Sequence, residues 1–176
     1  MSSFTDSIVI AGAGIGGLTL AIALQRRGIP VRVLERTRTL SPVGAGLTLQ
    51  PNAMAVMQAL GLTDAVIAAG QRVGRAAMLD AAGRLLGREQ DMAALTDAFG
   101  APALGIHRSR LHRVLLDVLD AEAPGTVELG TEVIDYELRG EGVVIRCADG
   151  ATDHASVLVG ADGLRRSEEH TSELQS

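Results

Sequence analysis

The sequence predicts an α/β fold. Short apolar segments alternate with turns marked by glycine, and 47% of the 176 residues are hydrophobic, which is enough to bury a core. Ser7 to Ala11 is an apolar, β-branched run typical of a buried parallel strand, and Val31 to Glu35 is a second. Between them, Ile15 to Arg27 predicts a helix that ends at Gly28. Together these segments predict a strand–helix–strand unit.

The middle of the chain predicts a loop, two short helices, a hairpin and an ambiguous segment. Pro51 suits the first position of a helix, and Gly61 suits its end. Ala81 to Arg84 is the expected turn of the hairpin. In chain order, the loop is Leu40 to Gln50, and the two helices are Pro51 to Gly61 and Leu62 to Ala69. The hairpin is Val73 to Arg88, and the ambiguous segment is Asp91 to Pro102.

The last third predicts one amphipathic helix and several strands. Ser109 is the expected N-cap of a helix that runs through Asp120. Its apolar face consists of Leu111, Val114, Leu115, Val118 and Leu119. The strands are expected at Val127 to Leu129, Val133 to Leu138, Val143 to Cys147 and Ser156 to Val159.

Composition excludes several classes of function. A net charge of −5 and only 2% aromatic residues argue against a nucleic-acid partner. Every basic residue is arginine, so a lysine-dependent phosphate loop and a Schiff-base lysine are both absent. The single cysteine fits a reducing cytoplasm. Ser7 to Leu24 carries no charge, but we interpret it as a buried strand, turn and helix rather than a membrane span.

No side chain of the predicted native segment, Met1 to Arg165, is assigned a catalytic role, and no metal site is predicted. The histidines His107, His112 and His154 lack metal-ligand spacing, so we expect them to be structural. Cys147 lies on a predicted strand and is expected to be a small buried side chain.

The C-terminal residues differ abruptly from the rest of the chain. Ser167 to Ser176 is polar and lacks apolar periodicity, and with Arg166 it spells RSEEHTSELQS, which resembles a translated sequencing adapter. We therefore expect residues 166–176 to be non-native and the natural sequence to be cut off near Arg165. A natural acidic linker is the alternative.

The turn after the first strand carries the main functional signal. Gly12-Ala13-Gly14-Ile15-Gly16-Gly17 has the spacing G-x-G-x-x-G between a strand and a helix. Such glycines allow a tight turn, a close approach of the backbone to a pyrophosphate, and close packing of the helix. The helix N-terminus offers free N–H groups and a positive dipole end to phosphates. The sequence therefore predicts a Rossmann-like dinucleotide-binding domain.

Glu35 supplies the second part of this pattern. It ends the second strand, eighteen residues after Gly17, where a carboxylate can accept hydrogen bonds from a ribose 2′-hydroxyl. It would repel a 2′-phosphate, so an unphosphorylated adenosine is expected. The pattern alone does not separate FAD from NAD, and an ordinary α/β turn with a surface glutamate is the alternative.

Three later segments carry a resemblance to a known family. They are Gly44-Ala45-Gly46-Leu47 followed by Gln50-Pro51-Asn52-Ala53, then Arg108-Ser109-Arg110-Leu111, then Gly160-Ala161-Asp162-Gly163. With the glycine loop and Glu35-Arg36, the chain from Ile8 to Arg165 resembles the N-terminal half of the single-component, FAD-dependent aromatic hydroxylases, which are flavoprotein monooxygenases. That family has a serine where this chain has Arg166.

The resemblance implies a role for each matching residue. The glycine loop would hold the pyrophosphate, with Gly12, Gly14, Ile15, Gly16 and Gly17 as cofactor-binding residues. Glu35 and Arg36 would hold the adenosine end, and Val133 falls where the family packs backbone against adenine. Gly46 would lie near the ribityl chain or flavin ring, Arg108 would contact the phosphates or the ribityl chain, and Asp162 and Gly163 would lie on the pyrophosphate side.

The resemblance also implies a domain plan and an activity. Residues 1–72 and 103–165 would form the FAD-binding domain, and residues 73–102 an inserted part of a β-rich substrate domain. The parent enzyme would hydroxylate a small aromatic or similarly electron-rich substrate with molecular oxygen, FAD, and NADH or NADPH as a transient reductant. The alternatives are another FAD enzyme such as a reductase or halogenase, an NAD-linked dehydrogenase, and an inactive truncated product. No feature specifies an oligomeric state, and no membrane partner is expected.

Overall fold

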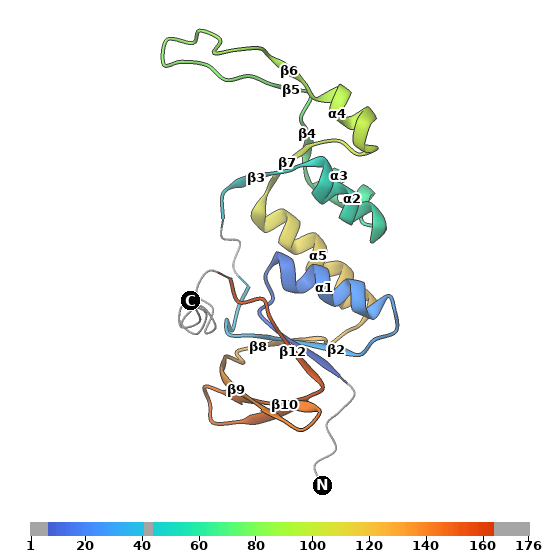
Figure 1. The fold of residues 1–176 in the computed structure, drawn as a ribbon, viewed down its shortest axis with the longest axis vertical. Coiled ribbons are helices and arrows are strands. Elements are labelled where there is room, and N and C mark those ends of the chain that lie inside the picture. Colours follow the sequence, from blue (N-terminus) through green and yellow to red (C-terminus); the bar gives the residue numbers. More distant parts are fainter. Residues whose placement is uncertain (1–6, 41–43, 164–176) are drawn as a thin grey trace. The chain divides into compact units, whose positions relative to one another are not determined.

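The computed structural model describes residues 7–40 and 44–163, with the exception of the Leu95 side chain (Figure 1). The chain forms two compact units. The first contains Met1–Ser41 and Leu115–Ser176, and the second contains Pro42–Val114. The predicted insertion, residues 73–102, lies inside the second unit, whose bounds are wider. The assignment of that insertion to a substrate domain stays a prediction, and the predicted non-native tail lies outside the described residues.

A four-stranded parallel sheet forms the centre of the first unit. Its strand order is β12-β1-β2-β8, and β1 pairs in parallel with both β2 and β12. Val9, Ile10 and Val33 are fully buried, which agrees with the continuous apolar runs expected for strands covered on both faces. The strands are β1 (Ile8–Ala11), β2 (Val31–Glu35), β8 (Val127–Leu129) and β12 (Val157–Gly160).

Helix α1 (Ile15–Gln25) connects β1 to β2. It buries Leu18, Ala21 and Ile22, and Gly28 adopts φ +71° just beyond its C-terminus. The strand, turn and helix predicted for the uncharged N-terminal stretch are therefore confirmed. Among the described residues, no helix combines the length and the apolar character needed to cross a membrane.

A three-stranded antiparallel sheet packs on the parallel sheet. It has the order β11-β10-β9, and in Figure 1 it lies on the opposite side of the parallel sheet from α1. Val143 and Ile145 of β10 form a core cluster with Val9 and Leu34 of the parallel sheet. The strands are β9 (Val133–Arg139), β10 (Gly142–Cys147) and β11 (Thr152–Ala155). The polar β11 was not predicted, since it has no apolar run.

The second unit contains a small antiparallel sheet and three helices. The sheet order is β3-β7-β4, with β3 (Gly46–Leu49), β7 (Leu104–His107) and β4 (Gln71–Arg72). A two-stranded hairpin is formed by β5 (Arg75–Ala76) and β6 (Gln90–Asp91). The helices are α2 (Pro51–Ala59), α3 (Thr63–Ala69) and α4 (Met92–Phe99).

One prediction for the second unit was wrong, and one segment that the sequence left ambiguous is a helix. The segment from Leu40 to Gln50 was expected to be irregular, but it contains β3, which pairs with the unpredicted β7. The ambiguous segment after the hairpin forms α4, because the Asp91 carboxylate accepts a hydrogen bond of 2.8 Å from the Ala93 N–H and caps the helix.

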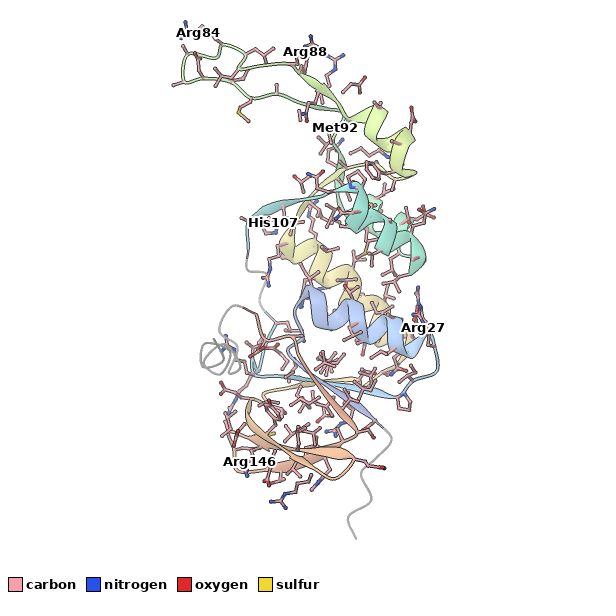
Figure 2. The ribbon with its side chains drawn as sticks, viewed as in Figure 1. Arg27, Arg84, Arg88, Met92, His107 and Arg146 are labelled. Atoms are coloured by element: carbon pink, nitrogen blue, oxygen red, sulfur yellow. The ribbon has the colours of Figure 1, made fainter. Side chains whose placement is uncertain are left out.

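The amphipathic helix α5 (Arg108–Glu122) begins one residue before its predicted N-cap. Ser109 is therefore inside the helix, and its hydroxyl lies 2.6 Å from Nδ1 of His107. His107 is at the end of β7 (Figure 2). The apolar face predicted for this helix is buried at three leucines spaced four residues apart, Leu111, Leu115 and Leu119.

Candidate dinucleotide site

The glycine loop begins where β1 ends. The Gly12 N–H donates a hydrogen bond of 2.8 Å to the Leu34 carbonyl, and Gly12 adopts φ +112°. A Cβ at this position would stand 2.5 Å from the carbonyl oxygen of Ala161, which follows β12. A side chain at residue 12 is therefore excluded by both the backbone conformation and the neighbouring strand end.

Gly17 is required by the packing of α1 on the loop itself. A Cβ at Gly17 would stand 2.0 Å from the Gly12 carbonyl oxygen, so only glycine allows the helix to come this close. The expected role of this glycine in close helix packing is consistent with this contact, although the nearest neighbour is the loop backbone rather than a strand.

Gly14 and Gly16 differ from the other two glycines. A Cβ at Gly14 would approach only the Ala161 carbonyl oxygen, at 3.9 Å, and a Cβ at Gly16 would have no neighbour within 4 Å. Gly14 is the N-cap of α1, no side chain caps the helix, and its first turn contains no acidic residue. The missing side chains therefore leave open space at a positive helix end, which suits a phosphate group.

The Glu35 side chain turns back toward this loop. Its Oε2 accepts a hydrogen bond of 2.8 Å from the Ala13 N–H, and its Oε1 accepts one of 2.9 Å from the Thr37 N–H. Burial raises the pKa of Glu35, but the donors from Thr37 and Ala13 outweigh it and hold this pKa below its ordinary value. An ionised carboxylate is thus fixed directly beside the glycine loop.

The segment after β8 joins the end of β2. The Thr131 N–H donates to the Glu35 carbonyl at 2.9 Å, and the Gly130 N–H donates to the Thr37 carbonyl at 3.0 Å. Val133 follows this connection, and its side chain packs against the core cluster between the two sheets. Arg36 is exposed, and its charge contributes to the lowered pKa of Glu35.

Asp162 and Gly163 follow β12, on the strand end that meets the glycine loop. Ala161 donates its N–H to the Ala11 carbonyl at 2.7 Å, which holds this turn against the end of β1. Asp162 and Gly163 are exposed, and Gly163 adopts φ +89°. The structure therefore brings together, within the first unit, the glycine loop, Glu35 and this Asp-Gly pair.

The other predicted residues gather in the second unit. Gly46 pairs with His107 across β3 and β7, and the Arg108 N–H donates a hydrogen bond of 3.1 Å to the Ala45 carbonyl. A Cβ at Gly44, which has φ +140°, would stand 2.9 Å from the Cβ of Arg108. The glycine-rich segment and Arg108 are thus neighbours, although they are far apart in the sequence.

Sequence reasoning missed two contributors to the first group. The Thr37 N–H holds Glu35, and no sequence signal indicated it, because the contact depends on the backbone turn after β2. Ala161 contributes through its backbone, because its carbonyl oxygen would stand 2.5 Å from a Cβ at Gly12. Cys147 is buried as predicted, and burial raises the pKa of its thiol. Within the described ranges, no three His, Cys, Asp or Glu side chains gather in a metal-binding arrangement.

A parallel sheet, a glycine loop at the start of its first helix, and an acid at the end of the neighbouring strand define a dinucleotide-binding α/β domain. Residues 5–174 match the family of FAD binding domains, and the chain belongs to this family. This finding confirms the predicted family resemblance and FAD as the cofactor, and it overturns the NAD-linked dehydrogenase alternative.

Two similar proteins are named a monooxygenase/isomerase and a hydroxylase, and a third was solved with FAD. The chain is 40% identical over 159 residues to an aurachin C monooxygenase/isomerase of Stigmatella aurantiaca, covering 90% of this chain and 40% of that protein. It is 35% identical over 165 residues to 3-hydroxybenzoate 6-hydroxylase 1 of Aquipseudomonas alcaligenes, covering 90% and 41%. HpxO of Klebsiella pneumoniae, solved with FAD and uric acid, matches with TM-score 0.75 and 26% identity, covering 90% and 40%. The chain thus spans about 40% of the length of these relatives.

Proposed function

We propose that this chain is the FAD-binding portion of a flavoprotein monooxygenase that hydroxylates a small aromatic or similarly electron-rich compound. The parent enzyme would consume molecular oxygen and use NADH or NADPH as a transient reductant. The contact that carries this proposal is the hydrogen bond from the Ala13 N–H to the Glu35 carboxylate, beside the open space at Gly14. The names of the related oxygenases support the reaction class.

The residues of the first unit would bind the dinucleotide. Gly14, Ile15 and Gly16 would present backbone N–H groups to the pyrophosphate at the N-terminus of α1. Glu35 would accept hydrogen bonds from the adenosine ribose, with Arg36 and the backbone near Val133 beside it. Asp162 and Gly163 would lie on the pyrophosphate side, because the turn that contains them is held against the loop.

The residues of the second unit would serve the rest of the cofactor. Arg108 would contact the phosphates or the ribityl chain, since a guanidinium group suits a phosphate. The backbone around Gly46 would lie near the ribityl chain or flavin ring. FAD supplies the redox chemistry when it is bound, while the protein binds it, orients it and excludes water. We assign no catalytic side chain within Met1 to Arg165.

The composition of this chain supports a proposal for the location and partners of the parent enzyme. The single buried cysteine fits the reducing cytoplasm, where we place the protein. Its partners would be the small-molecule substrate and molecular oxygen. Nucleic acid is not among them, since a net charge of −5 disfavours phosphate backbones.

Titration of the chain with FAD, followed by quenching of flavin fluorescence, tests the binding part of the proposal. We expect saturable binding that Gly14→Ala weakens roughly tenfold or more, because a methyl group would enter the space for the phosphates. Gly74→Ala is the matched control, since Gly74 is exposed and a Cβ there has no neighbour within 4 Å. Equal affinities of the chain and Gly14→Ala would argue against this site.

The reaction class is tested with the longer protein that contains this domain. Aromatic substrates should stimulate oxidation of NADH or NADPH and acquire an oxygen atom from labelled molecular oxygen. A reductase would oxidise the nicotinamide without transferring oxygen, and a halogenase would require halide and yield a halogenated product. Either of those results would replace the monooxygenase proposal with another FAD-dependent activity.

A further inference from the structure

Gly44 and Arg108 lie in contact within the second unit, although they are far apart in the sequence. A Cβ at Gly44 would stand 2.9 Å from the Cβ of Arg108, 3.1 Å from its Cδ and 3.3 Å from its Cγ. The aliphatic stem of Arg108 therefore occupies the space in which a side chain at residue 44 would begin. Gly44 also adopts φ +140°, a conformation that residues with a side chain disfavour.

The stem of Arg108 cannot turn aside to make room for such a side chain. A change of rotamer moves Cγ and Cδ, but the position of the Cβ is fixed by the main chain. The Arg108 N–H donates a hydrogen bond of 3.1 Å to the Ala45 carbonyl, which holds this main chain. Ile106 and Leu111, on either side of it, are buried. A side chain at residue 44 would thus displace the glycine-rich segment or the start of α5.

The two neighbours of Arg108 are joined to each other. Nδ1 of His107 lies 2.6 Å from the Ser109 hydroxyl, and the Ser109 N–H donates to the same nitrogen at 3.4 Å. This bridge spans Arg108, the first residue of α5. An arginine side chain loses much rotational freedom when a ligand fixes it. A stem that is already in place reduces this cost, so a ligand gains more from the guanidinium group.

We propose that Gly44 is a positioning residue of the cofactor site, whose missing side chain seats the stem of Arg108 and holds its guanidinium group in the orientation that receives a cofactor phosphate. This inference rests on the proposed function, because it takes Arg108 as a contact of FAD. It commits Arg108 to the phosphates rather than the ribityl chain, since a guanidinium group matches phosphate oxygens in charge and geometry.

The test titrates the chain with FAD at low and high ionic strength, by flavin fluorescence. Arg108→Met removes the charge and keeps most of the stem. It should weaken FAD binding roughly tenfold at low salt and reduce the salt dependence of the affinity. Gly44→Ala should weaken binding roughly fivefold or more and reduce the salt dependence in the same way, because the charge is displaced. Gly87→Ala is the matched control and should leave the affinity unchanged, since Gly87 lies in the same unit at φ +100° and a Cβ there has no neighbour within 4 Å.

Two further measurements separate positioning from a general structural effect. In an Arg108→Met background, Gly44→Ala should cause no further loss of FAD affinity, since the group that it places is gone. The second measurement needs no variant at residue 44 and therefore holds even if Gly44→Ala does not fold. In the unmodified chain without FAD, nuclear magnetic resonance relaxation should show the Arg108 Nε–H to be more rigid than that of Arg110, an exposed arginine of the same helix.

The outcomes distinguish the two proposals. A chain that does not bind FAD would contradict the proposed function, and this inference with it. A chain that binds FAD as well with Arg108→Met or Gly44→Ala as without would overturn only the role of Gly44. The same holds if Gly44→Ala weakens binding equally in both backgrounds, if it keeps the original salt dependence, or if the Arg108 Nε–H is as mobile as that of Arg110.

Discussion

The Ala161 carbonyl oxygen occupies the space in which Gly12 would carry a side chain, at 2.5 Å from the position of its Cβ. The two residues follow β12 and β1, which are neighbours in the parallel sheet. This close approach brings the ends of β1 and β12 together at the glycine loop. It also places the Asp162-Gly163 pair beside the loop. The glycines at 12 and 17 therefore serve the fold, while Gly14 leaves space at the helix N-terminus.

Gly12→Ala should destabilise the protein by about 3 kcal/mol, since the methyl group meets the Ala161 carbonyl and the backbone is strained at φ +112°. Urea unfolding followed by circular dichroism measures this loss. Gly16→Ala is the control, because a Cβ at Gly16 has open space and alanine favours a helix, so its stability should change by less than about 1 kcal/mol. Similar unfolding midpoints for the two variants would contradict this account of the loop.

The core between the two sheets gives a second prediction. Ile145 is fully buried in the cluster that joins β10 to Val9 and Leu34. Ile145→Ala should cost about 3 kcal/mol, because it leaves a cavity between the sheets. Leu138→Ala, at a residue that is 77% exposed, should cost less than about 0.5 kcal/mol. Thermal unfolding of both variants checks the difference, and equal losses would show that the cluster does not hold the sheets together.

The strand–helix–strand unit at the start of the chain could be predicted from the sequence because its signals are local. The strands at Ile8–Ala11 and Val31–Glu35 are rich in β-branched apolar residues. Gly12 follows the first strand, Gly28 follows the helix, and Pro30 precedes the second strand. β3 and β7 could not be predicted in this way. Gly46–Leu49 and Leu104–His107 are short, and they form strands by pairing with each other and, for β7, with β4.

The candidate site was predictable in its residue types but not in its contacts. The spacing of Gly12, Gly14 and Gly17 indicated a phosphate loop, but it did not show which glycine the fold itself requires. Glu35 was expected beside the loop, and the structure places it there. Thr37 could not be found from the sequence, because its role depends on the backbone turn after β2 rather than on a pattern of residues.

Glu35→Gln should show how much the Glu35 carboxylate contributes to the free energy of unfolding through its contact with the glycine loop. A glutamine offers one acceptor and one donor where two N–H groups converge, so we expect a loss of about 2 kcal/mol at neutral pH. The folded-state pKa of Glu35 lies below its ordinary value of 4.5, so the stability from its ionised form is present above that value. This stability is lost as the pH falls through the folded-state pKa.

The difference between Glu35→Gln and the original chain should therefore shrink in acid, which urea unfolding across a pH series measures. Glu141→Gln is the control, since Glu141 is exposed in the turn between β9 and β10. A loss that stays constant from neutral to acidic pH would show that the variant acts through packing and not through the charge of the carboxylate.

Arg32 joins three strands of the first unit and gives the last prediction. It contacts Glu128 of β8 and Asp153 of β11, each at 2.7 Å, and these carboxylates raise the pKa of its guanidinium group. Because all three side chains are partly exposed, Arg32→Met should cost only about 1 kcal/mol, and high salt should reduce the loss. Arg139→Met removes an exposed pair with Glu137 and should cause no measurable loss of stability. Unfolding at low and high ionic strength separates the two variants, and a salt-independent loss in Arg32→Met would contradict a stabilising role for the charge of Arg32.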